Sequence, residues 1–235
     1  MKAVIMVGGK GMRLRPLTEK KPKPLLDVGG RPLLFSIIEH LKLHGFDEIF
    51  LATNYLAEQF EEALGDGSAL GVSITYSLEE EPLGTAGPLK LIEGELCRSS
   101  EPFLVMNGDL LTDANITAML AYHGERDADF TVATRIMSLP LQYGAIRSVE
   151  GRVVGMDEKP NIQTEINAGI YLISPRVLSM MPKGSVLMTD FIRMLIDEGK
   201  LVVKYCLDGL WLDIGQVQEY ERANAIKNEA SHKEQ

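Results

Sequence analysis

The chain has 235 residues, of which 45% are hydrophobic and 24% charged, a balance typical of a globular protein with a sizeable core. Its formal net charge of −9 argues against general nucleic-acid binding, because phosphate backbones attract basic surfaces. No signal peptide is visible and no stretch approaches the ~18 apolar residues of a membrane helix, so we expect a cytoplasmic protein without membrane contact. Cys97 and Cys206 stand in no zinc-binding spacing and are expected to be free, buried thiols.

Short strands alternate with helices along the chain. The hydrophobic periodicity predicts strands at residues 3–7, 48–53, 72–76, 102–106 and 130–136, and helices at 32–44, 56–64, 85–93, 115–122, 191–196 and 217–226. This order predicts one α/β domain over residues 1–227, with a Rossmann-like, mixed but mostly parallel sheet and helices on both faces. Residues 145–173 are richer in strands, which predicts a small antiparallel excursion over one end of the sheet. The polar residues 228–235 are expected to form a flexible tail.

A glycine-rich loop follows the first predicted strand. It contains Gly8, Gly9 and Gly11, followed by Met12 and Arg13. Glycines let backbone N–H groups approach a phosphate closely, and arginine binds phosphate oxygens bidentately. The spacing fits neither a Walker A loop nor the dinucleotide fingerprint. Because basic residues gather here in an otherwise acidic chain, this loop is a candidate anion site.

Lys23 lies between two prolines in the run KPKP, which restricts the backbone that carries its ammonium group. The run GGKGMRLRPLT followed by KPKPLLDVGGRPLL resembles the opening signature of the sugar-phosphate nucleotidyltransferase family, and the resemblance extends from Met1 to about Ala225. It is closest to guanylyltransferases for glucosamine, mannose or heptose 1-phosphate. Met12 departs from the pattern, since many relatives carry Thr or Ser there.

Two aspartates are candidate metal ligands. Asp109 follows the strand at 102–106 in the triplet NGD, and Asp213 lies among apolar residues in WLDIG. Carboxylates suit Mg²⁺, and an unpaired buried carboxylate would otherwise be costly. The resemblance places the two metal-binding aspartates of the family at these positions. By contrast, Asp127 and Asp129 precede a strand and are expected to form a solvated turn.

The resemblance also assigns residues to the two substrates. For the nucleotide it implies the glycine-rich loop with Met12 and Arg13, Asp109, and the loop containing Gly84, Thr85 and Gly87. For the sugar phosphate it implies Gly144, Glu158, Lys159 and Asn167. The implied catalytic residues are Arg13 for the leaving pyrophosphate and Lys23 and Lys159 for the reacting phosphates. The four histidines are expected at the surface, with no part in the chemistry.

These features together favour a Mg²⁺-dependent enzyme that joins a nucleoside monophosphate to a sugar 1-phosphate and releases pyrophosphate. GTP is favoured, with a role in bacterial surface glycan or lipopolysaccharide synthesis. Three alternatives stay open: a uridylyl- or thymidylyltransferase, a glycosyltransferase with a related sheet, and an inactive regulatory subunit that binds nucleotide sugars. The expected partners are the NTP and the sugar phosphate, with a homo-oligomer also possible.

Overall fold

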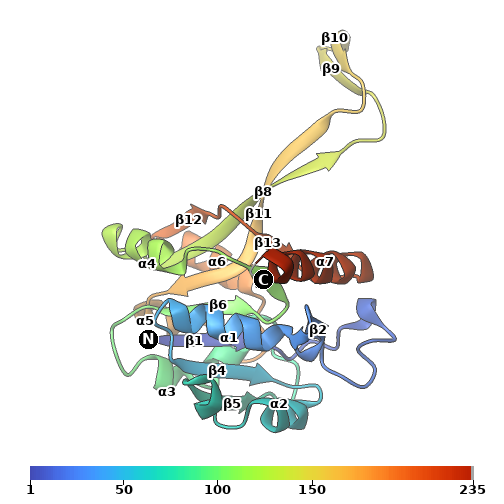
Figure 1. The fold of residues 1–235 in the computed structure, drawn as a ribbon. Helices are drawn as coiled ribbons and strands as arrows, with labels where there is room; N and C mark the ends of the chain where they lie inside the picture. Colours follow the sequence, from blue (N-terminus) through green and yellow to red (C-terminus); the bar gives the residue numbers. More distant parts are fainter. Residues whose placement is uncertain (234–235) are drawn as a thin grey trace.

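The computed structural model describes residues 1–233, and side chains as far as residue 229. Its centre is a seven-stranded mixed sheet in the order β12-β8-β11-β6-β1-β4-β5 (Figure 1). The strands are β1 (Lys2–Met6), β4 (Glu48–Thr53), β5 (Ser73–Leu78), β6 (Phe103–Asn107), β8 (Phe130–Pro140), β11 (Asn161–Ile173) and β12 (Val202–Cys206). β11 runs antiparallel to both of its neighbours, whereas the remaining pairs are parallel. The predicted mostly parallel α/β sheet is therefore confirmed.

Helices cover both faces of this sheet. They are α1 (Leu33–Leu43), α2 (Ala57–Leu64), α3 (Glu93–Leu96), α4 (Ile116–Glu125), α5 (Pro175–Leu178), α6 (Met188–Asp197) and α7 (Val217–Lys233). Alternate residues of β1 point to opposite faces, so Ala3 and Ile5 pack in the core with α1, while Val4 packs in the core with α6. Among the described residues, no helix has the length and apolar character needed to cross a membrane.

Two of the predicted elements differ from the structure. The helix expected at 85–93 is replaced by a 3-10 helix at Gly87–Lys90 and the short α3, since the backbone departs from helical geometry at Ala86 (φ −123°) and again at Ile92 (φ −115°). The tail expected from Asn228 instead begins inside α7, which reaches Lys233 because neither glycine nor proline interrupts residues 228–233. Residues 234–235 lie outside the described part.

The antiparallel excursion also differs in its placement. β8 and β11 continue beyond the sheet as a two-stranded ribbon that ends in the hairpin of β9 (Ala145–Val149) and β10 (Arg152–Asp157). This hairpin projects away from the body instead of lying over one end of the sheet (Figure 1). The cause is the long register between β8 and β11, which holds Asn161 opposite Pro140 and keeps the ribbon extended.

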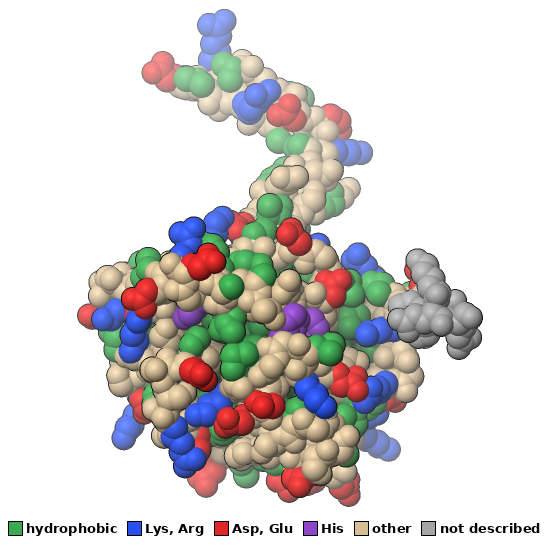
Figure 2. Space-filling model, turned by 60° about the vertical axis from the view of Figure 1, so that its left-hand side comes forward, with side chains coloured by type: hydrophobic (Ala, Val, Ile, Leu, Met, Phe, Trp, Pro, Cys, Tyr) green, Lys and Arg blue, Asp and Glu red, His purple; other side chains and the backbone are tan. Residues whose placement is uncertain are grey.

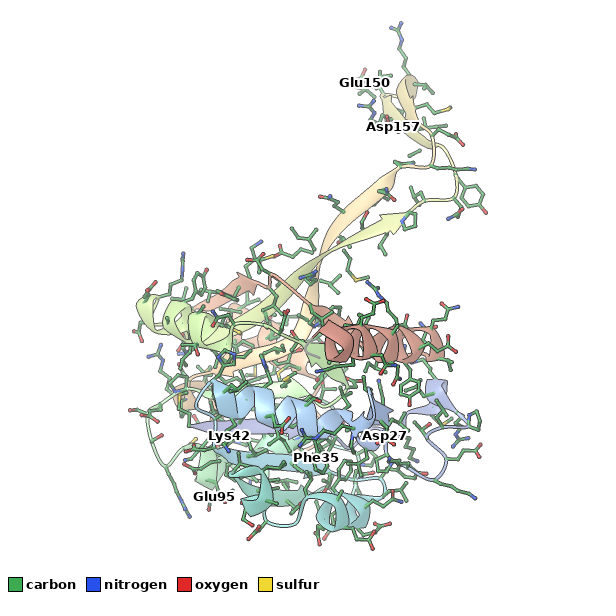
Figure 3. All side chains as sticks on the ribbon, in the orientation of Figure 1. Asp27, Phe35, Lys42, Glu95, Glu150 and Asp157 are labelled. Atoms are coloured by element: carbon green, nitrogen blue, oxygen red, sulfur yellow. The ribbon has the colours of Figure 1, made fainter. Side chains whose placement is uncertain are left out.

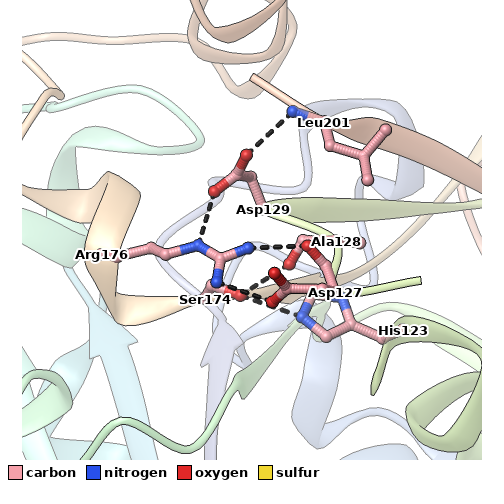
Figure 4. Close-up of polar contacts among 7 residues, drawn as sticks. All are labelled: His123, Asp127, Ala128, Asp129, Ser174, Arg176 and Leu201. Carbon is pink, nitrogen blue, oxygen red and sulfur yellow. Dashed lines mark hydrogen bonds and ion pairs between the residues drawn. The ribbon is translucent and has the colours of Figure 1, made fainter. Parts of the chain in front are cut away.

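The turn before β8, residues 127–129, is held by ion pairs between its two aspartates and Arg176 (Figure 4). Arg176 lies 2.8 Å from Asp127 and 2.7 Å from Asp129, and Asp129 also accepts a hydrogen bond from the Leu201 amide. Asp127 is exposed as expected, but Asp129 is mostly covered, so this turn holds β12 and α5 against β8.

His123 is buried beside this turn, contrary to the expected surface position, and bonds to the hydroxyls of Thr131 (2.8 Å) and Ser174 (3.0 Å). His40 and His44 are half-buried, and the side chain of His232 lies outside the described part. Cys97 and Cys206 are free as expected, but both are exposed. Cys97 directly follows α3, and Cys206 ends the edge strand β12.

The buried imidazole should make stability depend on pH. Burial, helped by the charge of Arg176, lowers the pKa of His123 below 6.5, so the unfolded chain binds more protons than the folded one as the pH falls below that value. The free energy of unfolding should therefore drop between pH 7.5 and 5.5, with a slope of up to about 1.4 kcal/mol per pH unit from this group. Burial also lowers the pKa of His40 and His44, so they add to the wild-type slope.

Urea unfolding across this pH range checks the expectation. His123→Gln should flatten the slope even if it lowers stability at every pH, whereas His44→Gln should flatten it less because His44 is less buried. Equal slopes in the wild type and His123→Gln would contradict it.

Candidate functional site

A pocket of about 570 Å³ opens beyond the carboxyl ends of β1, β4 and β6. Ligands of open α/β sheets bind at this edge, where loops leave the parallel strands. The cations that line the pocket are Lys10, Arg13 and Lys23. The lining comprises residues 6–13, 23, 24, 52, 54, 79, 82, 84, 85, 107–109 and 215. It contains all the candidate nucleotide residues except Gly87.

The glycine-rich loop is fixed by its own geometry. Gly11 has φ of 60°, and a Cβ there would come within 2.9 Å of the Thr18 methyl group, so the position requires glycine. The buried Thr18 hydroxyl donates to the Gly11 carbonyl at 2.7 Å, and Leu14 is buried in the core. Met12 is 59% exposed at the rim, where its side chain offers no hydroxyl to a ligand.

The predicted pair of aspartates comes together through a short antiparallel ladder. β7 (Leu110–Thr112) pairs with β13 (Trp211–Asp213), placing Asp213 opposite Leu110, and the Ile214 amide donates to the Asp109 carbonyl at 3.0 Å. Gly108 lets Asp109 turn off β6, since a Cβ there would lie 2.6 Å from Val7. Residues more than a hundred positions apart in the chain thus form one acidic site.

Lys23 lies between these two carboxylates. Its Nζ is 2.6 Å from Asp109 Oδ2 and 3.8 Å from Asp213 Oδ1, and its side chain is only 10% exposed. Burial and the charge of Asp109 raise the pKa of Asp213, against the opposing charges of Lys23 and Arg13. A Cβ on Gly215 would lie 3.5 Å from both Arg13 and Asp213, so the Arg13 guanidinium is close to this site.

The acidic pair fits a divalent cation that is shared with a phosphate. Asp109 Oδ1 is buried without a hydrogen-bond partner, although a buried carboxylate oxygen normally has one. Hard oxygen donors suit Mg²⁺, which keeps waters and substrate phosphates in its shell. No group of three or more His, Cys, Asp or Glu suited to a metal occurs in residues 1–233, so a cation here would need ligands from substrate or water.

The loop containing Gly84, Thr85 and Gly87, the candidate loop for the base, packs against residues 184–188. A Cβ on Gly84 would lie 2.6 Å from the Val186 carbonyl, and one on Gly87 would lie 2.5 Å from the Gly184 carbonyl. The Thr85 hydroxyl accepts a hydrogen bond from the Met188 amide at 2.8 Å. Gly84 and Thr85 line the pocket, whereas Gly87 is buried behind it and supports the loop.

Glu79 is a pocket residue that the sequence reasoning missed. It follows β5 directly, is 8% exposed, and accepts a hydrogen bond at Oε2 from the Leu83 amide at 3.0 Å. Its Oε1 faces Gly8, where a Cβ would lie 3.0 Å away, and Asn54 donates to its carbonyl. Burial raises the pKa of this carboxyl above its usual value. Its position after a strand, like that of Asp109, was the available signal.

None of the predicted sugar-phosphate residues lines the pocket, although Gly144 and Glu158 lie next to each other. Asn167 lies at the root of the ribbon, where its side chain bonds to the Tyr171 hydroxyl and the Gly169 amide. Gly144, Glu158 and Lys159 lie on the projecting hairpin, and none of them lines the pocket. Asp157, next to Glu158, lies far from the body in Figure 3. The extended ribbon keeps these residues away from their own chain's aspartates.

Comparison with known proteins agrees with this geometry. The chain matches the family model described as Nucleotidyl transferase over residues 2–230. Over 94% of its length it is 40% identical to mannose-1-phosphate guanylyltransferase 1 of Arabidopsis thaliana and 37% identical to mannose-1-phosphate guanyltransferase of Yarrowia lipolytica. It spans 63% and 62% of these relatives, respectively.

Solved structures share the fold. A Bacillus anthracis protein assigned as a glucose-1-phosphate thymidylyltransferase superposes with a TM-score of 0.79 at 26% identity, covering 97% of this chain and 95% of that one. HddC from Yersinia pseudotuberculosis, complexed with GMP-PN, gives 0.72 at 24% identity, covering 96% and 98%. The family match, the relatives and the fold agree, and the chain therefore belongs to the nucleotidyl transferase family.

Proposed function

We propose that this chain transfers a guanylyl group from GTP to a sugar 1-phosphate, giving a GDP-sugar and pyrophosphate. The observation that carries the reaction class is the acidic pair Asp109 and Asp213, held beside Lys23 at the end of a glycine-rich pocket. An unpartnered buried carboxylate oxygen beside a cationic loop suits a site for a phosphate and its counter-cation.

The reaction needs positioning and charge neutralisation, and no general base. A phosphate monoester already carries about −1.5 to −2 charges at neutral pH. One of its oxygens can form the new bond to the α-phosphorus while the bond to the β-phosphate oxygen breaks, and pyrophosphate leaves with the electron pair. Arg13 would hold the leaving pyrophosphate, and Lys23 would hold the reacting α-phosphate in line with the attacking oxygen.

Asp109 and Asp213 would hold Mg²⁺ when substrate binds. The cation would supply charge neutralisation for the phosphates. It would also offset both causes of the raised pKa of Asp213, its burial and the charge of Asp109. Lys23, already within 2.6 Å of Asp109, supplies part of that neutralisation from the protein itself.

Glu79 supports guanine as the base. Guanine presents its N1–H and N2–H₂ donors side by side, and a carboxylate can accept both. Uracil and thymine present one N–H between two carbonyl oxygens, which would face a buried carboxylate unfavourably. The exposed Glu80 next to it has no such contact with the pocket.

For the sugar, we propose mannose 1-phosphate first, because the curated relatives carry that name, followed by hexosamine and heptose 1-phosphates. A role in bacterial surface glycan synthesis rests on the sequence resemblance alone, since these relatives come from a plant and a yeast. A regulatory subunit without activity is disfavoured, because Arg13, Lys23 and Asp109 line the pocket and Asp213 lies 3.8 Å from Lys23. A glycosyltransferase would not need the lysine between the two aspartates.

Removing either carboxylate charge should abolish most of the activity. Asp109→Asn and Asp213→Asn should each lower kcat by about 10²–10³-fold, the range found when one stabilising group is lost at a transition state. Pyrophosphate release at limiting Mg²⁺ measures the effect, and thermal unfolding checks the fold. Asp208 is an exposed aspartate shortly before β13, so Asp208→Asn is the matched control: it removes one carboxylate charge outside the site and should keep wild-type turnover. Near-normal turnover in either site variant would exclude that residue as a ligand.

Replacing Glu79 should change base preference more than overall fold. Glu79→Gln keeps the size but offers one acceptor and one donor, so kcat/KM for GTP should fall by about 10²-fold or more relative to UTP and dTTP. The measurement is kcat/KM for four triphosphates with mannose 1-phosphate, using Glu80→Gln as control. Unchanged preference in Glu79→Gln would remove Glu79 from base recognition. A wild type that prefers UTP or dTTP would overturn the guanylyl assignment while leaving the reaction class intact.

A further inference from the structure

The ribbon and hairpin of residues 136–166, here named the arm, extend from the body without cover (Figures 1 and 2). The register between β8 and β11 runs unbroken from Asn167, opposite Thr134, to Asn161, opposite Pro140. Beyond it the Leu141 amide still donates to the Pro160 carbonyl at 3.0 Å. The arm is therefore a paired ribbon along this length.

This geometry keeps Lys159 away from the pocket of its own chain. The root of the arm is near the pocket, because a Cβ on Gly169 would lie 2.5 Å from the Asn107 side chain, which lines it. The six residue steps from Asn167 to Asn161 advance about 20 Å at about 3.3 Å per step, and Lys159 lies farther still. The four-carbon stem of a lysine cannot span that distance. Folding the arm back would break the β8–β11 ladder.

The arm has an apolar face that its own chain leaves in water. Met137, Leu139 and Ile162 lie on one side of the ribbon and are 37%, 48% and 46% exposed. Ser138, Gln163 and Glu165 lie on the other side, together with Ile136. Such alternation is typical of a ribbon with one covered face, and an isolated two-stranded hairpin is marginal in water.

The hairpin at its end repeats this pattern. Met156 pairs with Ile146, and both are exposed on one side, together with Val153. Arg147 and Asp157 form a 3.2 Å ion pair on the opposite side. A Cβ on Gly144 would lie 3.2 Å from Glu158, so these two candidate sugar residues already lie together at the base of the hairpin. The arm thus carries both an apolar contact face and a preformed piece of the proposed site.

The pocket offers a matching surface on the body. Met12, which lines the pocket, is an exposed apolar side chain. Val217, also exposed, begins α7 two residues after the lining residue Gly215. Its lining cations all come from the glycine-rich loop and the KPKP segment, that is, from Lys10, Arg13 and Lys23. The body therefore holds the nucleotide side of the site and lacks the lysine that the second phosphate requires.

We propose that two copies of this chain exchange arms, so that the arm of one copy covers the pocket of the other and supplies Glu158 and Lys159 in trans. This inference rests on the proposed function, which assigns a sugar phosphate to that pocket. A twofold exchange is self-complementary, so each dimer forms two equivalent sites. The apolar face of each arm would be buried against the rim of the partner's pocket, and each site would be incomplete in a single copy.

Complementation between two inactive variants tests the proposal. Asp109→Asn has a defective pocket and an intact arm, and Lys159→Ala has the reverse. The two chains are co-expressed with different tags, and the doubly tagged dimer is isolated and assayed for pyrophosphate release. Arm exchange puts both defects in one site and leaves the other intact, so the mixed dimer should show about half of the wild-type activity. Sites formed within one chain would give no more activity than the variants alone, which would overturn the proposal.

The mass in solution provides the second measurement. Light scattering after size-exclusion chromatography should find a dimer for the wild type and for Ser138→Glu, on the polar face, and a monomer for Leu139→Glu, on the apolar face. A monomeric wild type, or a dimeric Leu139→Glu, would overturn the exchange. Full activity in homogeneous Lys159→Ala would also overturn it. A wild type that is dimeric but inactive with every triphosphate and sugar phosphate would instead refute the proposed function, since the mass reports on the arm alone.

Discussion

The carboxylates of Asp109 and Asp213 and the ammonium group of Lys23 lie together next to the pocket, and the local backbone structure holds them in this arrangement. The β7–β13 ladder holds Asp109 and Asp213 together, although burial and, to a smaller extent, the charge of Asp109 raise the pKa of Asp213. When folding raises the pKa of a carboxyl group, the folded state becomes less stable as the pH rises above the group's ordinary pKa. The charged Asp213 therefore lowers the free energy of unfolding at neutral pH. Lys23 offsets part of this cost from 2.6 Å. A cation that binds the folded state would offset more, so ligand binding should stabilise the fold as well.

The rest of the pocket follows from the same constraint, since anionic substrates must enter a chain of net charge −9. The cations that line the pocket, Lys10, Arg13 and Lys23, all lie in the first 23 positions, where glycines and prolines fix the backbone that presents them. Glycines elsewhere serve close packing: at Gly84 and Gly108 a Cβ would meet backbone or core atoms at 2.6 Å. Glu79 lies between two loops of the pocket: its Oε2 accepts a hydrogen bond from the Leu83 amide, next to Gly84, and its Oε1 faces Gly8 of the glycine-rich loop. We propose that this carboxylate selects among bases.

Most of the body could be predicted from local pattern. Periodicity identified five of the seven strands of the sheet and the main helices, because each buries a continuous apolar face. β12 was not predicted, and β11 was expected only as part of a strand-rich region. The pairing of Asp109 with Asp213 could not be derived from spacing, since it depends on a ladder between distant segments, and only the family resemblance suggested it. Glu79 was missed because neighbouring glutamates hide it in the run EEE, and only the fold shows which of them is buried. His123 was misplaced because two hydroxyls from other elements satisfy its ring in the core.

The arm illustrates that a sequence motif can predict the chemical role of a residue without predicting where the fold places that residue. The motif around Lys159 predicts a phosphate contact, and the strand pattern of β8 and β11 predicts a ribbon, but a continuous ribbon carries that lysine away from the phosphate site of its own chain. Both local patterns can be satisfied together only if the contact is made with a different molecule, because folding the ribbon back would sacrifice its backbone hydrogen bonds. The apolar stripe on the ribbon supports that resolution, since its exposure in a single copy would be unfavourable in water. Local sequence, backbone pairing and the chemistry of two anionic substrates are thus consistent when the site is shared between two chains.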